Sequence, residues 1–466
     1  MLRKTFLIAG LFLLCLAASA QTEKTQSASR MLKTATSLME AQQFEAAEEF
    51  FTEGLAKAKK YADTYSQASA YEGLGNLYSR MDRPQQAVQN YKSALRLYKS
   101  LKLSVMVDVV ESLLKSIQGI GDLYAGIEIG AKGIKLSVIE VKLSKDREYD
   151  YTLVSDTAIN TDAASLSYQS EKETFDAITV LWRILKTRYQ IPPDKVHIVI
   201  SSGLKQELDK YNKVDYFANI IRPKELDANI PITYITPEEE SQLSLLGIVP
   251  QKRRFTATQL DVGSGNTKGG YYSDNKTFIP VTFPLGTKSF QRLIESKTEG
   301  DLNDYVNTAQ RLWLDSLRRV VVNEFFIKRD VRNRDIMYIS GGVVWAIASL
   351  MHPQSTNTNY TEISRQDISD FRKLLFTDFD KVTQPDLYFI SVPEQARAAQ
   401  KNINRVLNTY DKKALLAGTI WLDELIGEIN AVNPSKKFIY AKYAYVGWIS
   451  GYIIKQVTHK YTGLLN

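Results

Sequence analysis

Two stretches of the chain place an acidic residue directly before a glycine-rich turn. Residues 258–272 read TQLDVGSGNTKGGYY, with Asp261 ahead of the glycines, and residues 124–141 read YAGIEIGAKGIKLSVIEV, with Glu128 ahead of the glycines. Glycine lets a backbone turn sharply and point its N–H groups at an anion. A neighbouring carboxylate can hold a metal ion or its water. Two such turns, one in each half of an α/β body, would hold a phosphate chain from two sides.

A third acidic feature is the stretch ITPEEESQLSLLGIV, residues 235–249. Glu238, Glu239 and Glu240 open an expected helix there, where carboxylates suit the positive end of the helix dipole. One of them, reaching into a cleft, would be a general base that takes a proton from an attacking water. The other interpretation is an acidic helix start with no catalytic role, and the residues alone leave both open.

The elements that must position these residues alternate between strands and helices from residue 122 onward. Such alternation indicates an α/β body whose sheet is covered by helices. The pattern predicts a β-hairpin over 123–143, strands over 195–203, 259–262 and 335–342, and helices over 172–189, 237–246, 413–429 and 440–461.

In this order the stretches resemble a known family. The chain from residue 124 to its end resembles the exopolyphosphatase/guanosine pentaphosphate phosphohydrolase (Ppx/GppA) family of the actin–hexokinase superfamily. The matching stretches are those over 126–141, 198–208, 235–249, 260–268, 283–290 and 338–342. The resemblance implies two actin-like (ribonuclease H-like) α/β lobes, over residues 122–255 and 256–466.

The resemblance also implies an activity. The family hydrolyses terminal phosphoanhydrides of polyphosphate or guanosine pentaphosphate with Mg²⁺, so Glu240 would be the base, and Glu128 and Asp261 would serve the metal. Phosphates would be held by Gly130, Ala131, Lys132, Gly133, Ser202, Lys205, Gly263, Ser264, Gly265, Asn266, Thr267 and Lys268. Positioning and charge neutralisation supply most of phosphoryl-transfer catalysis.

Three residues depart from the family pattern. Glu128 stands where the family usually has Asp, and Lys132 stands where it has a small polar residue. Lys268 stands where the family usually has a second metal-handling Glu, so the charge is reversed. That reversal removes a metal ligand and repels a cation, although an ammonium can pair with phosphate as a point charge. The cleft is expected to be more basic and poorer in metal ligands than the family norm.

The region over residues 27–121 is expected to contain helices only. It resembles a short tetratricopeptide array, because Ala47 and Phe51 recur 40 residues later as Ala87 and Tyr91. The residues that carry the later repeat are Tyr71, Leu74, Gly75, Tyr78, Ala87, Tyr91 and Ala94, and residues 105–120 are expected to add a third, degenerate helix or a cap. Such an array either binds a protein partner in its groove or serves as a packing module of its own chain.

The first twenty residues have the pattern of a secretory signal peptide, with Arg3 and Lys4 before an apolar run and Ala18-Ser19-Ala20 before the expected cleavage. Lipid anchoring at Cys15 and an uncleaved anchor are the alternatives. Cys15 is the only cysteine, so the cleaved chain would have no disulfide, thiolate or cysteine metal site. We expect export to the periplasm or cell envelope, with no transmembrane helix after cleavage.

Two functions follow as expectations. The first is an exported phosphoanhydride hydrolase that releases terminal phosphate from polyphosphate-like chains. The second is a catalytically inactive envelope protein that binds a phosphate-rich ligand, or a protein through its repeats. The formal charge of +7 is dispersed over 466 residues, which argues against nucleic acid as a ligand. A homodimer is left open.

Overall fold

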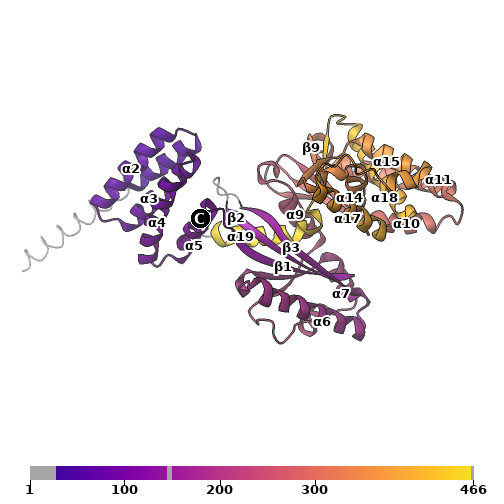
Figure 1. Ribbon diagram of the computed structural model, residues 1–466, viewed down its shortest axis with the longest axis horizontal. Helices are drawn as coiled ribbons and strands as arrows, with labels where there is room; N and C mark the ends of the chain where they lie inside the picture. The colour runs from indigo at the N-terminus through magenta and orange to yellow at the C-terminus, as the bar shows by residue number, and fades with distance from the viewer. Residues whose placement is uncertain (1–27, 144–148, 463–466) are drawn as a thin grey trace, which may run out of the picture. The chain divides into compact units, whose positions relative to one another are not determined.

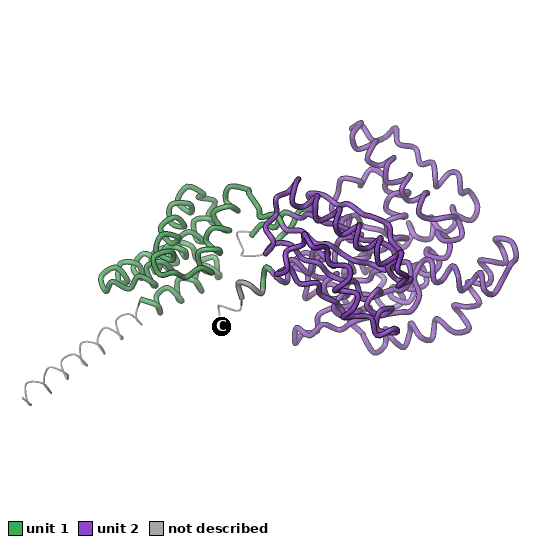
Figure 2. Tube along the Cα trace, turned by 90° about the horizontal axis from the view of Figure 1, so that it is seen from below, with its two compact units in different colours: residues 1–123, 140–152, 457–466 green, residues 124–139, 153–456 purple. Residues whose placement is uncertain are grey.

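The computed structural model describes residues 28–143 and 149–462. The expected signal peptide, residues 1–20, lies outside the described residues. The chain divides into two compact units, coloured separately in Figure 2. Unit 1 comprises residues 1–123, 140–152 and 457–466, and unit 2 comprises residues 124–139 and 153–456. Within the described residues, no helix combines the length and apolar character needed to span a membrane.

Unit 1 is built from successive helices joined by tight turns (Figure 1). A helix through residues 28–40 is followed by α2 (Phe44–Lys60), α3 (Thr64–Arg80), α4 (Pro84–Ser100) and α5 (Ser104–Ile117). The turns share one left-handed residue every twenty positions, namely Gln42, Ala62, Asp82 and Lys102. Two helices therefore repeat every forty residues, which confirms the predicted period, and α5 is the helix expected over residues 105–120.

Aromatic side chains of the repeat fill the space between these helices. Phe51 and Tyr91, the pair from which the repeat was predicted, are each 1 % exposed. The Tyr91 hydroxyl donates to Asn76 Oδ1 at 2.8 Å, and the Tyr98 hydroxyl donates to Glu72 Oε2 at 2.8 Å. A buried tyrosine hydroxyl needs such a partner, so these contacts fix how α3 and α4 pack.

Two mixed sheets lie mainly in unit 2, and residues 122–123 of β1, 140–143 of β2 and 149–152 of β3 belong to unit 1. The first has the order β3-β2-β1-β4-β5, and the second has the order β10-β11-β9-β6-β7-β8. Their strands are β1 (Asp122–Gly130), β2 (Gly133–Leu143), β3 (Tyr149–Asn160), β4 (Val196–Ile200), β5 (Ile232–Tyr234), β6 (Thr258–Val262), β7 (Thr267–Tyr272), β8 (Phe278–Phe283), β9 (Ile336–Gly341), β10 (Tyr360–Glu362) and β11 (Lys437–Ala441).

The two sheets repeat one topology. In the first, β2 lies beside β1 and β3 lies beside β2. On its other side β1 pairs in parallel with β4, which pairs in parallel with β5. In the second, β7 lies beside β6 and β8 lies beside β7. On its other side β6 pairs in parallel with β9, which pairs in parallel with β11. The two predicted acid–glycine hairpins, β1–β2 and β6–β7, therefore occupy equivalent places.

Helices cover these sheets, as predicted for an α/β body. They are α6 (Tyr168–Ile184), α7 (Ser202–Lys210), α8 (Val214–Ile220), α9 (Pro237–Ile248), α10 (Thr287–Glu295), α11 (Leu302–Leu312), α12 (Arg318–Ile327), α13 (Asp330–Asn333), α14 (Gly342–Met351), α15 (Arg365–Thr377), α16 (Phe379–Thr383), α17 (Pro393–Thr409), α18 (Lys412–Asn430) and α19 (Gly447–Thr462). Figure 1 shows α14, α15, α17 and α18 grouped beside β9. In the core of the second sheet, the Trp421 ring of α18 contacts the rings of Phe283, Phe290 and Trp313.

The predicted helix over 440–461 is wrong at its start. Residues 437–441 form strand β11, and the helix begins only at Gly447. β11 pairs in parallel with β9, and its Phe438 and Tyr440 are buried. Pairing with a neighbouring strand is a long-range interaction that overrides a local helical pattern.

Helices α9 and α19 cross at glycines with their backbones in contact. A Cβ atom added to Gly247 would lie 1.9 Å from the Gly447 carbonyl oxygen. A Cβ atom added to Gly451 would lie 1.9 Å from the Leu243 carbonyl oxygen. Only glycine allows helices to approach this closely, so the crossing fixes the position of α9, the helix that carries Glu240.

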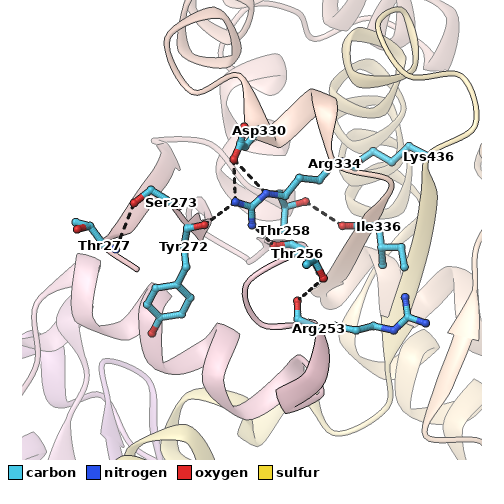
Figure 3. Close-up of polar contacts among 11 residues, drawn as sticks. Arg253, Thr256, Thr258, Tyr272, Ser273, Thr277, Asp330, Arg334, Ile336 and Lys436 are labelled. Atoms are coloured by element: carbon cyan, nitrogen blue, oxygen red, sulfur yellow. Dashed lines mark hydrogen bonds and ion pairs between the residues drawn. The ribbon is translucent and has the colours of Figure 1, made fainter. Parts of the chain in front are cut away.

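At the end of the second sheet where β6 and β9 begin, one arginine joins three segments (Figure 3). Arg334 donates from Nη1 to the Ala257 carbonyl at 3.0 Å, and from Nη2 to the Tyr272 carbonyl at 2.5 Å and to Asp330 Oδ2 at 2.8 Å. The Lys436 ammonium donates to the Arg334 carbonyl. Lys436 is only 5 % exposed, and this burial lowers its pKa from 10.5 to about 7.

Replacing Lys436 with Met is expected to change how stability depends on pH. Between the folded pKa of about 7 and the ordinary value of 10.5, the unfolded chain binds more protons than the folded chain, so this lysine makes stability rise with pH. In Lys436→Met the slope of the unfolding free energy between pH 7 and pH 9 should fall by about 1 kcal/mol per pH unit. Urea titrations at several pH values measure it.

The neighbouring Lys437 supplies the control. Its side chain is 59 % exposed and lies 3.4 Å from Glu362, so Lys437→Met should leave the slope unchanged. Equal slopes in wild type and Lys436→Met would show that Lys436 is not held neutral by burial.

Candidate functional site

Each hairpin places a lysine across from its acid. In the β6–β7 ladder Asp261 is the direct partner of Lys268. In the other hairpin, Lys135 Nζ of β2 lies 3.5 Å from Glu128 Oε1 of β1. In both, the lysine follows the acid by seven residues. Each hairpin therefore brings one carboxylate and one ammonium to its turn end.

Of the three consecutive glutamates, only Glu240 is buried in the site. Glu239 forms a capping box with Thr236, whose N–H donates to Glu239 Oε2 at 2.8 Å while the Glu239 N–H donates to Thr236 Oγ1 at 3.1 Å. Glu238 is exposed, whereas Glu240 is 5 % exposed. The two interpretations of the acidic stretch thus apply to different residues. Glu239 caps the helix, and Glu240 is the buried carboxylate of the candidate site.

Both oxygens of the Glu240 carboxylate have partners. Oε2 accepts from the Ser202 hydroxyl at 2.5 Å and from the Ser202 N–H at 3.1 Å, at the start of α7. Oε1 accepts from the Lys268 ammonium. Ser202, predicted to contact phosphate, thus positions Glu240, and Lys268 forms an ion pair with the predicted base.

Asp261 is held from the neighbouring strand. Ser340 of β9 lies beside it in the parallel ladder, and the Ser340 hydroxyl donates to Asp261 Oδ1 at 2.7 Å. The charges of Asp261, Glu128 and Glu240 all favour the charged form of Lys268 and so raise its pKa.

The pKa values of this cluster follow from burial and from Lys268. Burial would raise the pKa of Glu240, but the Lys268 ammonium and the Ser202 hydrogen bonds outweigh it and hold that pKa below its ordinary value. Burial raises the pKa of Glu128 and of Asp261, with nearby lysines opposing the rise. Burial would lower the pKa of Lys268, but Glu240 and Asp261 outweigh it and raise that pKa. At neutral pH, Lys268 is an ammonium and Glu240 a carboxylate.

The two glycine turns orient their backbones alike. In the β1–β2 turn, the Ala131 carbonyl accepts from the Ala164 N–H at 3.1 Å. In the β6–β7 turn, the Ser264 carbonyl accepts from the Lys288 N–H at 2.8 Å. The carbonyls of these turns therefore bond inward to their own lobes. Across the described part of the chain, no hydrogen bond uses the N–H groups of Ala131, Lys132, Ser264 or Gly265 as donors. Ser264 and Gly265 are also exposed, so their N–H groups are accessible to an anion.

Three predicted phosphate contacts have other partners for their side chains. Lys132 pairs with Asp162 at 2.5 Å, and Lys205 pairs with Asp209 at 2.7 Å within α7. The Thr267 hydroxyl is buried, where it donates to the Leu285 carbonyl at 2.7 Å and accepts from Trp421 Nε1 at 2.9 Å. The structure brings together Glu128, Ser202, Glu240, Asp261 and Lys268, with the turns over 130–133 and 263–266 in the same two hairpins.

Sequence reasoning missed Lys135 and Ser340. Lys135 could have been found, because it follows Glu128 by the same seven residues by which Lys268 follows Asp261. Ser340 meets Asp261 only through the parallel pairing of β6 and β9, for which the sequence holds no local signal.

The residues of the site, as arranged, do not fit a Mg²⁺ ion. Mg²⁺ requires oxygen ligands in near-octahedral geometry. Both Glu240 oxygens and Asp261 Oδ1 already accept hydrogen bonds, and the Lys268 ammonium lies among the carboxylates. Over residues 28–143 and 149–462, no group of three or more His, Cys, Asp or Glu side chains has an arrangement that would hold a metal ion. Glu128 Oε2 is buried without a hydrogen-bond partner among these residues.

The fold and these turns define an actin-like two-lobed α/β protein with an N-terminal helical repeat. A tetratricopeptide repeat family model matches residues 20–100. No curated protein sequence matches the chain. A solved structure of the Aquifex aeolicus Ppx/GppA phosphatase, its type II variant, is 13% identical with a TM-score of 0.50, covering 72% of this chain and 99% of that one.

A second Aquifex aeolicus Ppx/GppA structure is 14% identical with a TM-score of 0.50, covering 73% of this chain and 98% of that one. At this identity the likeness concerns the fold. It confirms the predicted resemblance to the Ppx/GppA fold, with two actin-like lobes behind tetratricopeptide-like helices. The chain thus combines both architectures.

Proposed function

We propose that this protein binds phosphate chains at the site formed by its two hairpins without hydrolysing them. The observation that carries the proposal is the pairing of Glu240, whose two oxygens accept from Lys268 and from Ser202. This is the second of the two functions expected from the sequence, and the geometry favours it over the first.

A general base must accept a proton from water. The ideal pKa for this task lies near the working pH. The Lys268 ion pair instead holds the pKa of Glu240 below its ordinary value, so the carboxylate is a weak base. Its Oε1 already accepts from the Lys268 ammonium, so a proton taken from water would be placed beside a positive charge, which opposes the transfer.

The capacity to bind phosphate rests on other groups. Accessible N–H groups of the β6–β7 turn and the Lys135 ammonium are donors suited to phosphate oxygens. The Lys135 side chain is 43 % exposed, so its charge can be reached by a ligand. A phosphate chain, which carries a negative charge on each unit, matches donors spread over two hairpins better than a single orthophosphate does.

The test is release of orthophosphate from tripolyphosphate, with Mg²⁺ or Mn²⁺ present. We expect wild type and Glu240→Gln to give the same background release. A matched variant, Lys268→Glu, restores the acid of the family pattern. Release by Lys268→Glu but not by wild type would identify Lys268 as the residue that prevents turnover. Release by wild type that Glu240→Gln abolishes would overturn the proposal.

One observation favours hydrolysis as a second candidate function. Glu128, Asp261 and Glu240 face the same ammonium, in a fold shared with a protein described as a Ppx/GppA phosphatase. In this candidate, a bound phosphate draws Lys268 away and frees Glu240 as the base. The same assay decides between the two functions, because only hydrolysis depends on Glu240.

We propose further that the protein is exported to the periplasm or cell envelope and that its helical repeats bind a protein partner. The secretory pattern of residues 1–20 supports export. The tetratricopeptide match over residues 20–100 supports an interaction role for unit 1.

A further inference from the structure

The candidate site pairs acidic side chains with basic ones. Glu128, Asp261 and Glu240 supply three carboxylates, and Lys135 and Lys268 supply two ammonium groups. The two lysines occupy equivalent positions, because each follows the acid of its own hairpin by seven residues and lies on the second strand of that hairpin.

Both lysines lie where a cation would bind. Lys268 bonds to Glu240 Oε1 and is the direct ladder partner of Asp261. Lys135 lies 3.5 Å from Glu128 Oε1. A divalent ion that bound these carboxylates would either break an ion pair by displacing its ammonium or lie beside a like charge, and both arrangements cost free energy.

The positions also differ in access, which separates their roles. The side chain of Lys268 is 17 % exposed and that of its partner Glu240 is 7 % exposed, so this pair is enclosed. Lys135 is 43 % exposed, so it can turn from Glu128 toward a ligand without breaking an enclosed pair. Lys268 thus compensates the carboxylates, and Lys135 faces the entering anion.

We propose that Lys135 and Lys268 take the place of a divalent cation, so that the candidate site binds its phosphate ligand without metal and excludes divalent ions. The identity of the ligand as phosphate rests on the proposed function, whereas the exclusion of divalent ions rests only on the charges of these side chains.

The test titrates the purified wild-type protein and its variants with Mn²⁺ alone, followed by electron paramagnetic resonance of the free ion and by calorimetry. We expect no saturable site in wild type. In Lys268→Met the three carboxylates lose their internal cation, and we expect one saturable Mn²⁺ site per chain. In Lys268→Arg the charge is kept, and we expect no site.

Lys205→Met is the matched control. It removes a lysine that pairs with Asp209 on the surface of α7, so it should titrate as wild type does. Saturable binding of Mn²⁺ to wild type at one site, abolished in Glu128→Gln, would overturn the inference even if Lys268→Met failed to fold. If unchanged circular dichroism shows that Lys268→Met is folded and the variant still gains no Mn²⁺ site, the inference is overturned too.

A binding titration separates this inference from the proposed function. Tripolyphosphate is added to wild type and to Lys135→Met, each in excess chelator. We expect wild type to bind and Lys135→Met to bind at least tenfold more weakly. Binding by wild type only when Mg²⁺ is restored would overturn the inference and leave phosphate binding intact. Absence of binding with and without Mg²⁺ would overturn the proposed function, and the Mn²⁺ titration would still decide the exclusion of metal.

Discussion

Lys268→Met is expected to lower the free energy of unfolding at pH 7 by about 3–5 kcal/mol, the range seen when one partner of a buried ion pair is removed. The change leaves Glu240, which is 5 % exposed, without its ammonium partner. It also removes the cation that most opposes the rise in the pKa of Asp261 and that, after Lys135, opposes the rise in the pKa of Glu128. Urea unfolding of wild type and variant measures the difference.

The pH dependence of this loss has a definite sign. In wild type the pKa of Glu240 is lowered, so its contribution to stability is present above the unfolded pKa and is lost as pH falls through the folded pKa. In Lys268→Met burial raises the folded pKa of the same carboxyl, so the folded chain binds more protons than the unfolded chain. The variant should therefore recover part of its deficit as pH falls from 7 toward 5.

Lys205→Met again supplies the reference. Its partner Asp209 is 49 % exposed, and partly exposed pairs of this kind contribute about 0–1 kcal/mol. If Lys268→Met were no more destabilised than Lys205→Met, or if its deficit grew as pH fell, the Glu240–Lys268 pair would not be the main interaction of the candidate site.

Gly451→Ala is expected to destabilise the protein by about 3 kcal/mol or more, at the upper end of what overpacking causes. The added Cβ would lie 1.9 Å from the Leu243 carbonyl oxygen. Backbone atoms cannot turn aside as a flexible side chain can, so α19 and α9 would have to separate. Because α9 carries Glu240, the variant should also disturb the contact between Glu240 and Ser202.

Gly203→Ala is the matched change without a clash. Nothing lies within 4 Å of a Cβ added there, and Ala is preferred over Gly in helices, so stability should stay within about 1 kcal/mol of wild type. Thermal unfolding of both variants provides the comparison. Equal stability of Gly451→Ala and Gly203→Ala would show that the two helices have room to adjust.

Much of this architecture could be predicted from local patterns. The two acid–glycine hairpins, the strand over 335–342 and the helix over 413–429 are marked by strong periodicity or by glycine turns, and the structure has them. The forty-residue helical period is likewise encoded in repeated small and aromatic residues. Each of these features depends on residues close together in the chain.

What could not be predicted depends on contacts between distant segments. β11 is a strand because β9 lies beside it. The sequence marks Lys268 as unusual, but only the folded chain shows that its partner is Glu240, 28 residues away. Ser202 likewise holds Glu240 over 38 residues. Ser202 and Lys268, both expected to contact phosphate, therefore bond to the Glu240 carboxylate instead.

The most direct test is a phosphorus-31 magnetic resonance spectrum of tripolyphosphate incubated with the wild-type protein and Mg²⁺. One spectrum reports both binding, as broadened tripolyphosphate resonances, and hydrolysis, as a new orthophosphate resonance. We predict broadened resonances and no orthophosphate above that of a protein-free sample. Orthophosphate that accumulates with wild type and is absent with Glu240→Gln would contradict the proposal.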